Sequence, residues 1–232
     1  MGITLDNLLP RAKEHPIFAS CEDDEIKRLL IETKARLRKT SSQEIVLHEC
    51  DQAEWIALVV SGEYEFSYCG ADESVRHSVC ILSKGDVFGA VLVGLQINHY
   101  PGMLFSRSEG ELLILRCDEL RKRLNRKSFC RFNVNLYCMA CQAIYRIWMK
   151  MNLFSCYKTA DRIRLYLKNE LLMNPCKPIV FNYIQLADYL CVNRTALYRV
   201  IRKMIRQKEL QVIPFGDQLA FKIGCDFNLL KK

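Results

Sequence analysis

The hydrophobic pattern changes character once along this chain. From about Leu37 to Cys117, short apolar or alternating runs recur, and turn signals such as Ser61-Gly62 and Lys84-Gly85-Asp86 separate them. Short runs at this spacing predict an antiparallel β-barrel or sandwich. A helical segment, 23–34, precedes them and begins with acidic residues, as suits a helix N-terminus. The strand-like runs are EIVLHE, WIALVVSGEYEFSY, RHSVCILS, DVFGAVLVG, GMLFS and ELLILR.

After Cys117 the apolar positions take a helical period. One series steps by three and four residues, which is the spacing of a heptad seam. A second apolar series leaves the helix only a narrow polar stripe, so it needs two partners. We expect these to be its own barrel and the same helix of a second subunit; the alternative is a single helix buried in a monomer. The expected seam residues are Val134, Tyr137, Cys141, Ile144, Trp148 and Met151.

Three further helical segments follow, at Tyr157–Leu172, Tyr183–Leu190 and Asn193–Gln207. Two short apolar runs then flank Gly216-Asp217, a pair that is typical of a β-hairpin turn. Two short helices followed by a hairpin form a winged helix-turn-helix. The predicted fold class is therefore α+β, with a sensing barrel over 1–118, a linker and dimerisation helix over 119–153, and a winged helix-turn-helix over 154–232.

The net charge of +8 conceals an asymmetry. Residues 1–118 hold 12 Lys and Arg against 19 Asp and Glu, whereas residues 119–232 hold 22 against 7. Only the second half is therefore a candidate for binding a polyanion. The alternative is a solvated basic face. No Gly-rich phosphate loop, HExxH motif or serine nucleophile elbow is present, so we expect a protein that is not an enzyme.

The second helix of the pair has two chemically different faces. Leu197, Val200, Ile201 and Met204 have core spacing, and Asn193 is a good N-cap. The opposite face suits a major groove, because Arg pairs bidentately with guanine and Thr contacts a thymine methyl group. Tyr198 can stack or donate to a phosphate. This face carries Arg194, Thr195, Tyr198, Arg199, Arg202 and Arg206.

Twelve cysteines are many for a chain of 232 residues. No secretory signal and no apolar stretch long enough for a membrane span are visible, so we expect a cytoplasmic protein whose thiols are reduced. Cys138 and Cys141 lie on one face of the predicted dimer helix, and with a symmetry mate they offer four thiolates, a ligand set that suits zinc. The alternative is that both pack as seam hydrophobes. We expect no metal and no cofactor, and the second functional hypothesis is a metal or redox sensor that uses these cysteines.

Five segments resemble the CRP/FNR superfamily of bacterial transcription regulators, and the resemblance covers nearly the whole chain. IQLADYLCVNRTALYRVIRKM is similar to that family's helix-turn-helix, and HPIFASCEDDEIKRLL to its opening helix. WIALVVSGEYEFS and LSKGDVFG resemble its cyclic-nucleotide-binding-type barrel, and LFSCYKTADRIRLYL the joint between the dimer helix and the DNA-binding domain.

The resemblance implies a homodimer on a roughly palindromic operator, with half-sites about 34 Å apart. It implies base reading by Arg194, Thr195 and Arg199. It also implies contacts to the DNA backbone or to flanking bases by Asn193, Tyr198 and Arg202. The expected partners are double-stranded DNA, a second copy of the chain, RNA polymerase and an unidentified small-molecule effector, with no membrane.

The chain departs from the family's pattern at several positions. Thr195 stands where many members carry a glutamate, which leaves the operator sequence open. Ala90 follows the Phe88-Gly89 corner where cyclic-nucleotide binders carry a Glu, and no Arg follows until Arg107. We therefore expect that cyclic AMP does not bind. Two glycines usual in the barrel turns are replaced by Gln43 and Cys50.

An effector, if there is one, is expected against an aromatic region of the barrel. Its residues are Phe88, Gly89, Tyr100 and Phe105. The alternative is that these side chains are simply core. The N-terminal cysteine cluster of the family's iron–sulfur sensors is missing, because only Cys21 precedes Cys50.

Overall fold

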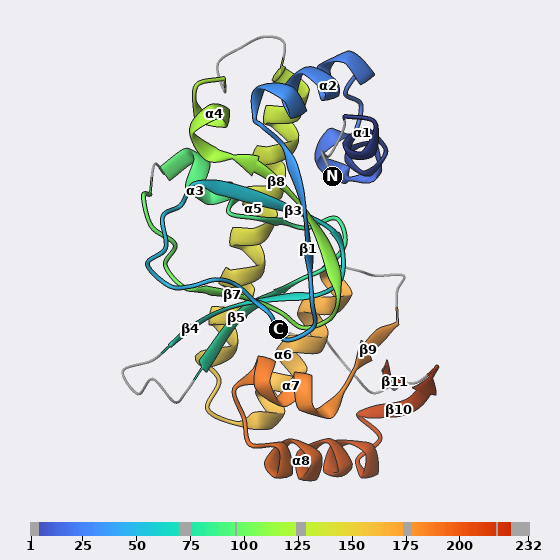
Figure 1. Ribbon diagram of the computed structural model, residues 1–232. Coiled ribbons are helices and arrows are strands. Elements are labelled where there is room, and N and C mark those ends of the chain that lie inside the picture. Colours follow the sequence, from blue (N-terminus) through green and yellow to red (C-terminus); the bar gives the residue numbers. More distant parts are fainter. Residues whose placement is uncertain are drawn as a thin grey trace. The chain divides into compact units, whose positions relative to one another are not determined.

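The structure is a computed structural model that describes residues 5–69, 76–95, 97–123, 129–173, 178–216 and 218–223. The chain forms two compact units, Met1–Tyr145 and Arg146–Lys232. Figure 1 shows the elements of each unit in sequence colours.

The first unit contains two four-stranded antiparallel sheets. The strand orders are β1-β8-β3-β6 and β2-β7-β4-β5. This is the antiparallel architecture that the turn spacing predicts. The strands are β1 (Arg36–Thr40), β2 (Ile45–Leu47), β3 (Trp55–Ser61), β4 (Tyr64–Cys69), β5 (Arg76–Leu82), β6 (Val87–Phe88), β7 (Met103–Ser106) and β8 (Gly110–Arg116).

Strand β3 is buried on both of its faces, which explains its continuous apolar run. Because side chains alternate along a strand, Ile56 and Leu58 point into one core, shared with the N-terminal helices. Ala57 and Val59 point the other way, into the core between the sheets. Strand β8 alternates in the same manner, so these two central strands carry both cores of the unit.

Helices flank the sheets. Helix α2 begins at a capping box in which Glu22 and Glu25 satisfy each other's backbone N–H groups, and the first turn carries three acidic residues. We expected the segment DVFGAVLVG to be one strand, and this prediction was wrong. Strand β6 stops at Phe88, Gly89 takes a φ of +82°, and a helix follows. The helices of this region are α1 (Leu5–Glu14), η1 (Pro16–Phe18), α2 (Asp23–Glu32), α3 (Ala90–Leu95) and α4 (Cys117–Arg121).

Helix α5 (Cys130–Phe154) is continuous over 25 residues and carries the predicted seam. Its Phe132 and Leu136 pack into the core formed by the N-terminal helices. One apolar side of the helix is therefore covered by its own unit, as the pattern of two apolar series predicts.

The second unit is a winged helix-turn-helix. A three-stranded sheet of order β10-β11-β9 packs against three helices around a single core. Strands β10 and β11 form the predicted hairpin, with Phe215 opposite Gln218; Asp217 of the expected turn lies outside the described residues. The elements are α6 (Thr159–Met173), β9 (Ile179–Phe181), α7 (Tyr183–Leu190), α8 (Arg194–Arg206), β10 (Leu210–Phe215) and β11 (Gln218–Ile223).

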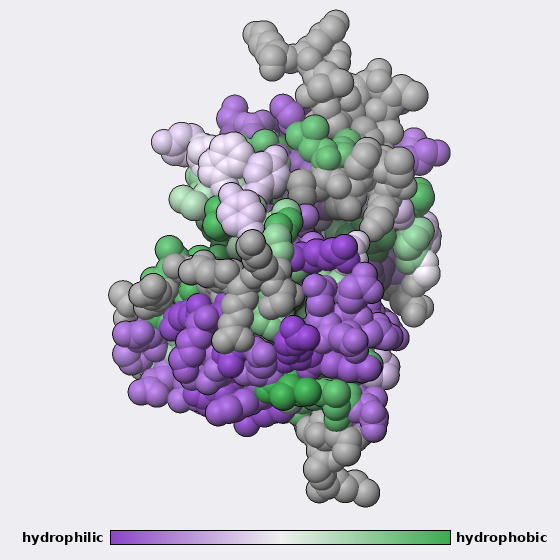
Figure 2. All heavy atoms as spheres, turned by 90° about the horizontal axis from the view of Figure 1, so that it is seen from above, coloured by the Kyte–Doolittle hydropathy of each residue, from purple (hydrophilic) through white to green (hydrophobic). Residues whose placement is uncertain are grey.

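The described surface is mostly hydrophilic on the face drawn in Figure 2, with smaller apolar patches between the polar side chains. Among the described helices, none is both long enough and apolar enough to cross a bilayer.

Candidate nucleic-acid interface and effector region

The turn between α7 and α8 is held by side-chain and backbone caps. Asn182 and Asn193 are the N-caps of the two helices: Asn182 Oδ1 accepts from the N–H of Ile184 at 2.8 Å, and Asn193 Oδ1 accepts from the N–H of Thr195 at 2.9 Å. Cys191 ends α7 in the left-handed conformation, with a φ of 51°, and its N–H bonds back to the carbonyls of the last turn. These caps fix where α8 begins, and therefore which side chains its first turn presents.

Helix α8 divides into a buried face and a basic face. Leu197, Ile201 and Met204 are at most 1% exposed, as their spacing predicts. The side chains of the opposite face are all exposed to solvent, and no acidic residue lies on this helix. The exposed residues of the candidate interface are Arg194, Thr195, Tyr198, Arg199, Arg202 and Arg206.

The basic side chains of the second unit are not equivalent. Arg162 donates to the carbonyls of Leu190 and Cys191 at 3.0 and 3.2 Å, and so ties α6 to the turn. Arg164 forms ion pairs with Glu209 and Asp161. Within the described part of the chain, by contrast, no ion pair involves the arginines of the α8 face. The charges of these arginines are therefore not neutralised by ion pairs among the described residues.

Tyr198 does not stand alone on the α8 face. Its ring packs edge-on against Tyr183 at 5.4 Å, and the guanidinium of Arg202 lies 4.9 Å from its centroid. Sequence reasoning missed Tyr183, whose position at the start of α7 carried no signal apart from its aromatic ring. The contacts orient Arg202 along the outer face of α8 and restrict the freedom of both side chains.

The aromatic chain continues from Tyr183 into the wing. Phe181 packs against Tyr183 at 5.3 Å and stacks on Phe221 of β11 at 3.9 Å with an interplanar angle of 8°. The hairpin and α8 are thus held together by ring contacts that run through β9.

The predicted seam of α5 lies on its uncovered side. Val134 and Trp148 are each 55% exposed, and Tyr137 is 70% exposed. Side chains of this size are rarely left in water in a helical row. The six exposed seam residues are Val134, Tyr137, Cys141, Ile144, Trp148 and Met151.

In the barrel, aromatic rings occupy the region where we expected an effector. Phe88 contacts Tyr100 at 5.6 Å, and both contact Trp55, at 6.1 and 5.3 Å. Phe66 joins them at 5.4 Å from Phe88. Sequence reasoning did not single out Trp55 and Phe66, although both stand in alternating strand runs. The Tyr100 hydroxyl donates to the carbonyl of Trp55 at 2.6 Å, and burial raises the pKa of Tyr100.

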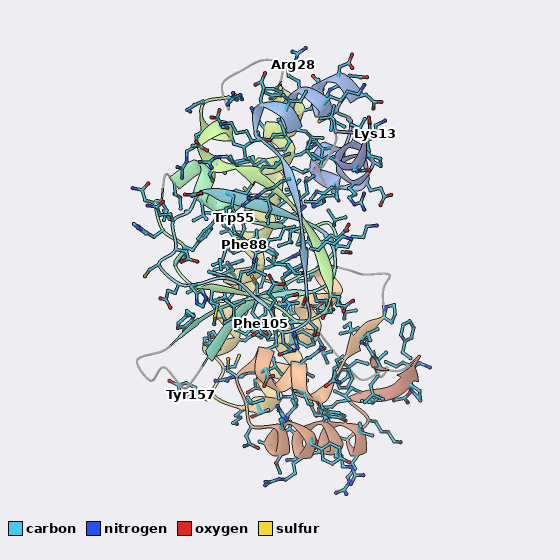
Figure 3. All side chains as sticks on the ribbon, in the orientation of Figure 1. Lys13, Arg28, Trp55, Phe88, Phe105 and Tyr157 are labelled. Carbon is cyan, nitrogen blue, oxygen red and sulfur yellow. The ribbon has the colours of Figure 1, made fainter. Side chains whose placement is uncertain are left out.

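Phe105 is not part of this cluster. It follows the fully buried Leu104 on β7, so it points to the other face of the sheet and is only half-buried. Figure 3 shows Trp55 and Phe88 next to one another and Phe105 apart from them.

The residues that replace the usual nucleotide ligands are also placed. A Cβ on Gly89 would contact Ile56 and Leu92 at 3.4 Å, so the corner is closely packed. Ala90 is buried at the start of α3. Arg107 lies 3.7 Å from Glu65, on the sheet face that also carries Phe105. These side chains provide no cation inside the aromatic cluster.

Cys138 and Cys141 are both exposed on α5. Among the described residues, no group of three or more His, Cys, Asp or Glu side chains within this one chain is arranged to hold a metal ion. A hydrogen bond with Cys141 raises the pKa of the Tyr137 hydroxyl.

Comparisons with known proteins find solved structures of the same fold but no relative by sequence. No family model matches the chain, and no curated sequence matches it. The solved structures it resembles include the c-di-GMP-responsive global regulator CLP of Xanthomonas campestris, with a TM-score of 0.64 and 16% identity over 86% of this chain and 98% of that one.

Two further structures give the same picture. A variant of CooA from Carboxydothermus hydrogenoformans has a TM-score of 0.68 and 13% identity, covering 85% of this chain and 87% of that one. FixK2 from Bradyrhizobium japonicum has a TM-score of 0.63 and 17% identity, covering 84% of this chain and 94% of that one. The chain therefore has the fold of these CRP/FNR-type regulators, which confirms the fold that the resemblance in sequence implied.

Proposed function

We propose that this chain is a sequence-specific DNA-binding transcription regulator. The observation that carries the proposal is the exposed face of α8, where Arg194, Arg199, Arg202 and Arg206 lie without ion-pair partners among the described residues. A capped helix with an unpaired basic face fits the major groove and its phosphates. One neighbour in structure, CLP, is named as a global regulator, which supports the same class.

The roles of the α8 side chains follow from their places on the helix. Arg194, Thr195 and Arg199, on the first two turns, read base edges. Asn193 uses its Oδ1 for the cap, so only its amide N–H groups remain to donate to a phosphate. Arg202, supported by the Tyr198 ring, contacts the backbone.

The regulator acts as a homodimer through the exposed seam of α5. A second copy is the occupant that fits, because the 3-4 spacing of the row matches the same row on an identical helix. The two helices run parallel: each α5 continues into its own helix-turn-helix unit, and both units must reach one duplex. RNA polymerase is the further partner, and the cytoplasm is the site of action.

The barrel does not bind cyclic AMP. Ring packing occupies the interior around Phe88 and Tyr100, and Arg107 is paired with Glu65. We assign effector sensing to 1–118, dimerisation to 119–153 and DNA binding to 154–232. The effector is an uncharged or aromatic small molecule that displaces or stacks on these rings.

Selection of bound sequences from random DNA tests the proposal. We compare the wild-type chain, the variant Arg199→Ala and the control Lys27→Ala. The control removes one positive charge from a half-buried lysine of α2, in the other unit. We expect the protein and the control to enrich the same two-fold symmetric site, and Arg199→Ala to lose preference at one position in each half-site. No enrichment by the folded wild-type protein would overturn the proposal, and equal enrichment by all three would overturn the base-reading role of Arg199.

A further inference from the structure

The thiol of Cys141 lies in the middle of the exposed seam of α5. Val134 and Tyr137 precede it, and Ile144 and Trp148 follow it, at intervals of three and four residues. Its side chain is exposed in the chain as described. A cysteine in this place is presented on the same surface as the row of large apolar side chains.

The geometry of a parallel helix pair brings such a residue against its own copy. In a parallel, in-register pair the first core position of each heptad faces the same position of the other helix. Packed helices lie about 8–10 Å apart, and each Cα lies about 2.3 Å from its own axis, so facing Cα atoms approach to roughly 3.4–5.4 Å. A disulfide joins Cα atoms about 4.4–6.8 Å apart.

Cys138 supplies an internal comparison. It lies three residues before Cys141 and is also exposed, but it is not one of the 3-4 row of seam residues. At 100° per residue its side chain points about 60° away from that of Cys141. In a parallel pair the two Cys138 thiols therefore lie on opposite flanks of the seam, too far apart to join.

We propose that Cys141 is the site of a disulfide between two copies of this chain, formed in response to hydroperoxides. The proposal rests on the parallel homodimer of the proposed function, and adds to it a covalent modification site. In the first step the Cys141 thiolate of a separate chain attacks the peroxide, the O–O bond breaks, and a sulfenic acid and one alcohol or water are formed. In the second step the thiol of Cys141 of the partner subunit attacks that sulfur, the S–O bond breaks, and water leaves.

The consequence is a change in how DNA binding depends on protein concentration. Two separate chains must meet before they bind a two-fold site, so at low concentration the occupancy rises with the square of the protein concentration. A linked pair binds as one molecule, and the occupancy then rises linearly. The disulfide thus preserves DNA binding at concentrations at which the reduced chains dissociate.

The experiment compares the wild-type chain with Cys141→Ser and the matched control Cys138→Ser. Each is treated with hydrogen peroxide, quenched with catalase, alkylated and run on a non-reducing gel. We expect wild type and Cys138→Ser to give a species of twice the chain mass that dithiothreitol removes, and Cys141→Ser to give at least tenfold less. Equal cross-linking in Cys141→Ser, or none in a dimeric wild type, would overturn the proposal.

Sedimentation of the three reduced proteins tests the disulfide proposal separately from the homodimer on which it rests. A reduced wild type that stays monomeric at all concentrations overturns the homodimer. A reduced dimer in which Cys141 does not cross-link leaves the homodimer in place and overturns the parallel, facing arrangement of Cys141. Thermal unfolding of both serine variants establishes that each retains the fold of the wild type, so that a missing cross-link reports on the thiol alone.

Discussion

The ammonium nitrogen of Lys150 lies 4.9 Å from the centroid of the Tyr189 ring. Lys150 is near the end of α5 and only 5% exposed, and Tyr189 belongs to α7, the first helix of the helix-turn-helix. Tyr189 in turn contacts Tyr166 of α6, with ring centroids 5.5 Å apart. A buried cation over an aromatic face thus joins the end of α5 to α7, and through Tyr189 to α6.

The same turn of α5 serves two surfaces. Trp148 is exposed in the seam. Lys150 follows Cys141 by nine residues, which is two and a half helical turns, so it lies on the side of the helix opposite the seam. A seam contact that rotates this turn of α5 must also move Lys150 against Tyr189. In the proposed dimer, seam packing and the position of α7 are therefore linked through one helical turn.

A double-mutant cycle measures the Lys150–Tyr189 contact. We expect Lys150→Met and Tyr189→Leu to show a coupling of about 0.5–2 kcal/mol in the free energy of unfolding, because a desolvated cation–π contact has this magnitude. Urea denaturation of the two single variants and the double variant gives the value. A parallel cycle of Lys150→Met with Tyr183→Leu, whose described ring contacts are with Phe181 and Tyr198, should be additive. Additivity in both cycles would contradict a specific contact.

The buried His15 predicts an acid-sensitive stability. Its Nδ1 accepts from the N–H of Ile17 at 3.3 Å and its Nε2 donates to the carbonyl of Asp86 at 3.2 Å, so the ring fits only as the neutral form. Burial lowers the pKa of His15 below 6.5. Below pH 6.5 His15 is protonated in the unfolded chain but stays neutral in the folded chain. The free energy of unfolding therefore falls as the pH falls from 6.5 toward the pKa of His15 in the folded chain, by at most about 1.4 kcal/mol per pH unit.

The variant His15→Asn tests this assignment, because an asparagine keeps an acceptor for the Ile17 N–H and does not titrate. Denaturation at pH 7.5 and pH 5.5 should show a smaller loss of stability in the variant than in the wild type. The same loss in both proteins would place the acid sensitivity at another group.

Two barrel turns hold side chains where the backbone favours glycine. Gln43 and Cys50 have φ values of 68° and 67°, which confirms that these residues stand in turns of the kind that glycine normally occupies. A left-handed residue with a Cβ costs roughly 1–2 kcal/mol, and glycine restores part of it. We expect Cys50→Gly to raise the free energy of unfolding by about 0.5–1 kcal/mol. The neighbouring Glu49→Gly, at a position without positive φ, should lower it, and a loss of stability in both would argue against strain.

Most of the fold could be predicted because its patterns are local. The segment Tyr183–Leu190 is predicted to the residue, and α8 differs from the expected helix by one residue at each end, since Asn193 and Gln207 are its caps. The end of β6 was missed because an apolar run of nine residues is compatible with either a strand or a helix. Only the left-handed φ of Gly89 separates the two elements.

The candidate effector region shows the limit of reasoning from sequence. Phe88 and Tyr100 come together from segments twelve residues apart, and their partner Trp55 comes from a different strand. Phe105 carries the same residue type but lies on the other face of its strand. Which aromatic rings meet depends on sheet register, which the spacing of turns does not determine.

Arg199 should contribute specificity more than bulk affinity. Loss of a bidentate arginine–guanine contact costs about 1–3 kcal/mol, so Arg199→Ala should bind the selected operator roughly 5- to 150-fold more weakly and discriminate less at one base pair. Arg202→Ala should weaken binding to all sequences and reduce the slope of log affinity against log salt by about 1. Fluorescence anisotropy at three salt concentrations separates the two. If both variants lose only non-specific affinity, Arg199 does not read a base.

Trp148→Glu should dissociate the proposed dimer. In the chain alone the indole is 55% exposed, so a glutamate there costs the monomer little. In a parallel pair it would face the same glutamate of the second copy, and two unpaired carboxylates in an apolar seam cost several kcal/mol. Since 1.4 kcal/mol is tenfold in affinity, we expect the dimer dissociation constant to rise by at least ~100-fold in sedimentation equilibrium.

The matched control for this charge is Gln142→Glu. Gln142 is exposed on the same helix but is not one of the 3-4 row of seam residues, so it adds the same carboxylate to α5 without placing it in the seam. An unchanged dissociation constant in this control, together with dissociation in Trp148→Glu, assigns the effect to the seam and not to the charge of the helix. Equal dissociation in both variants would instead indicate general repulsion, and an intact dimer in both would mean that α5 pairs through another face.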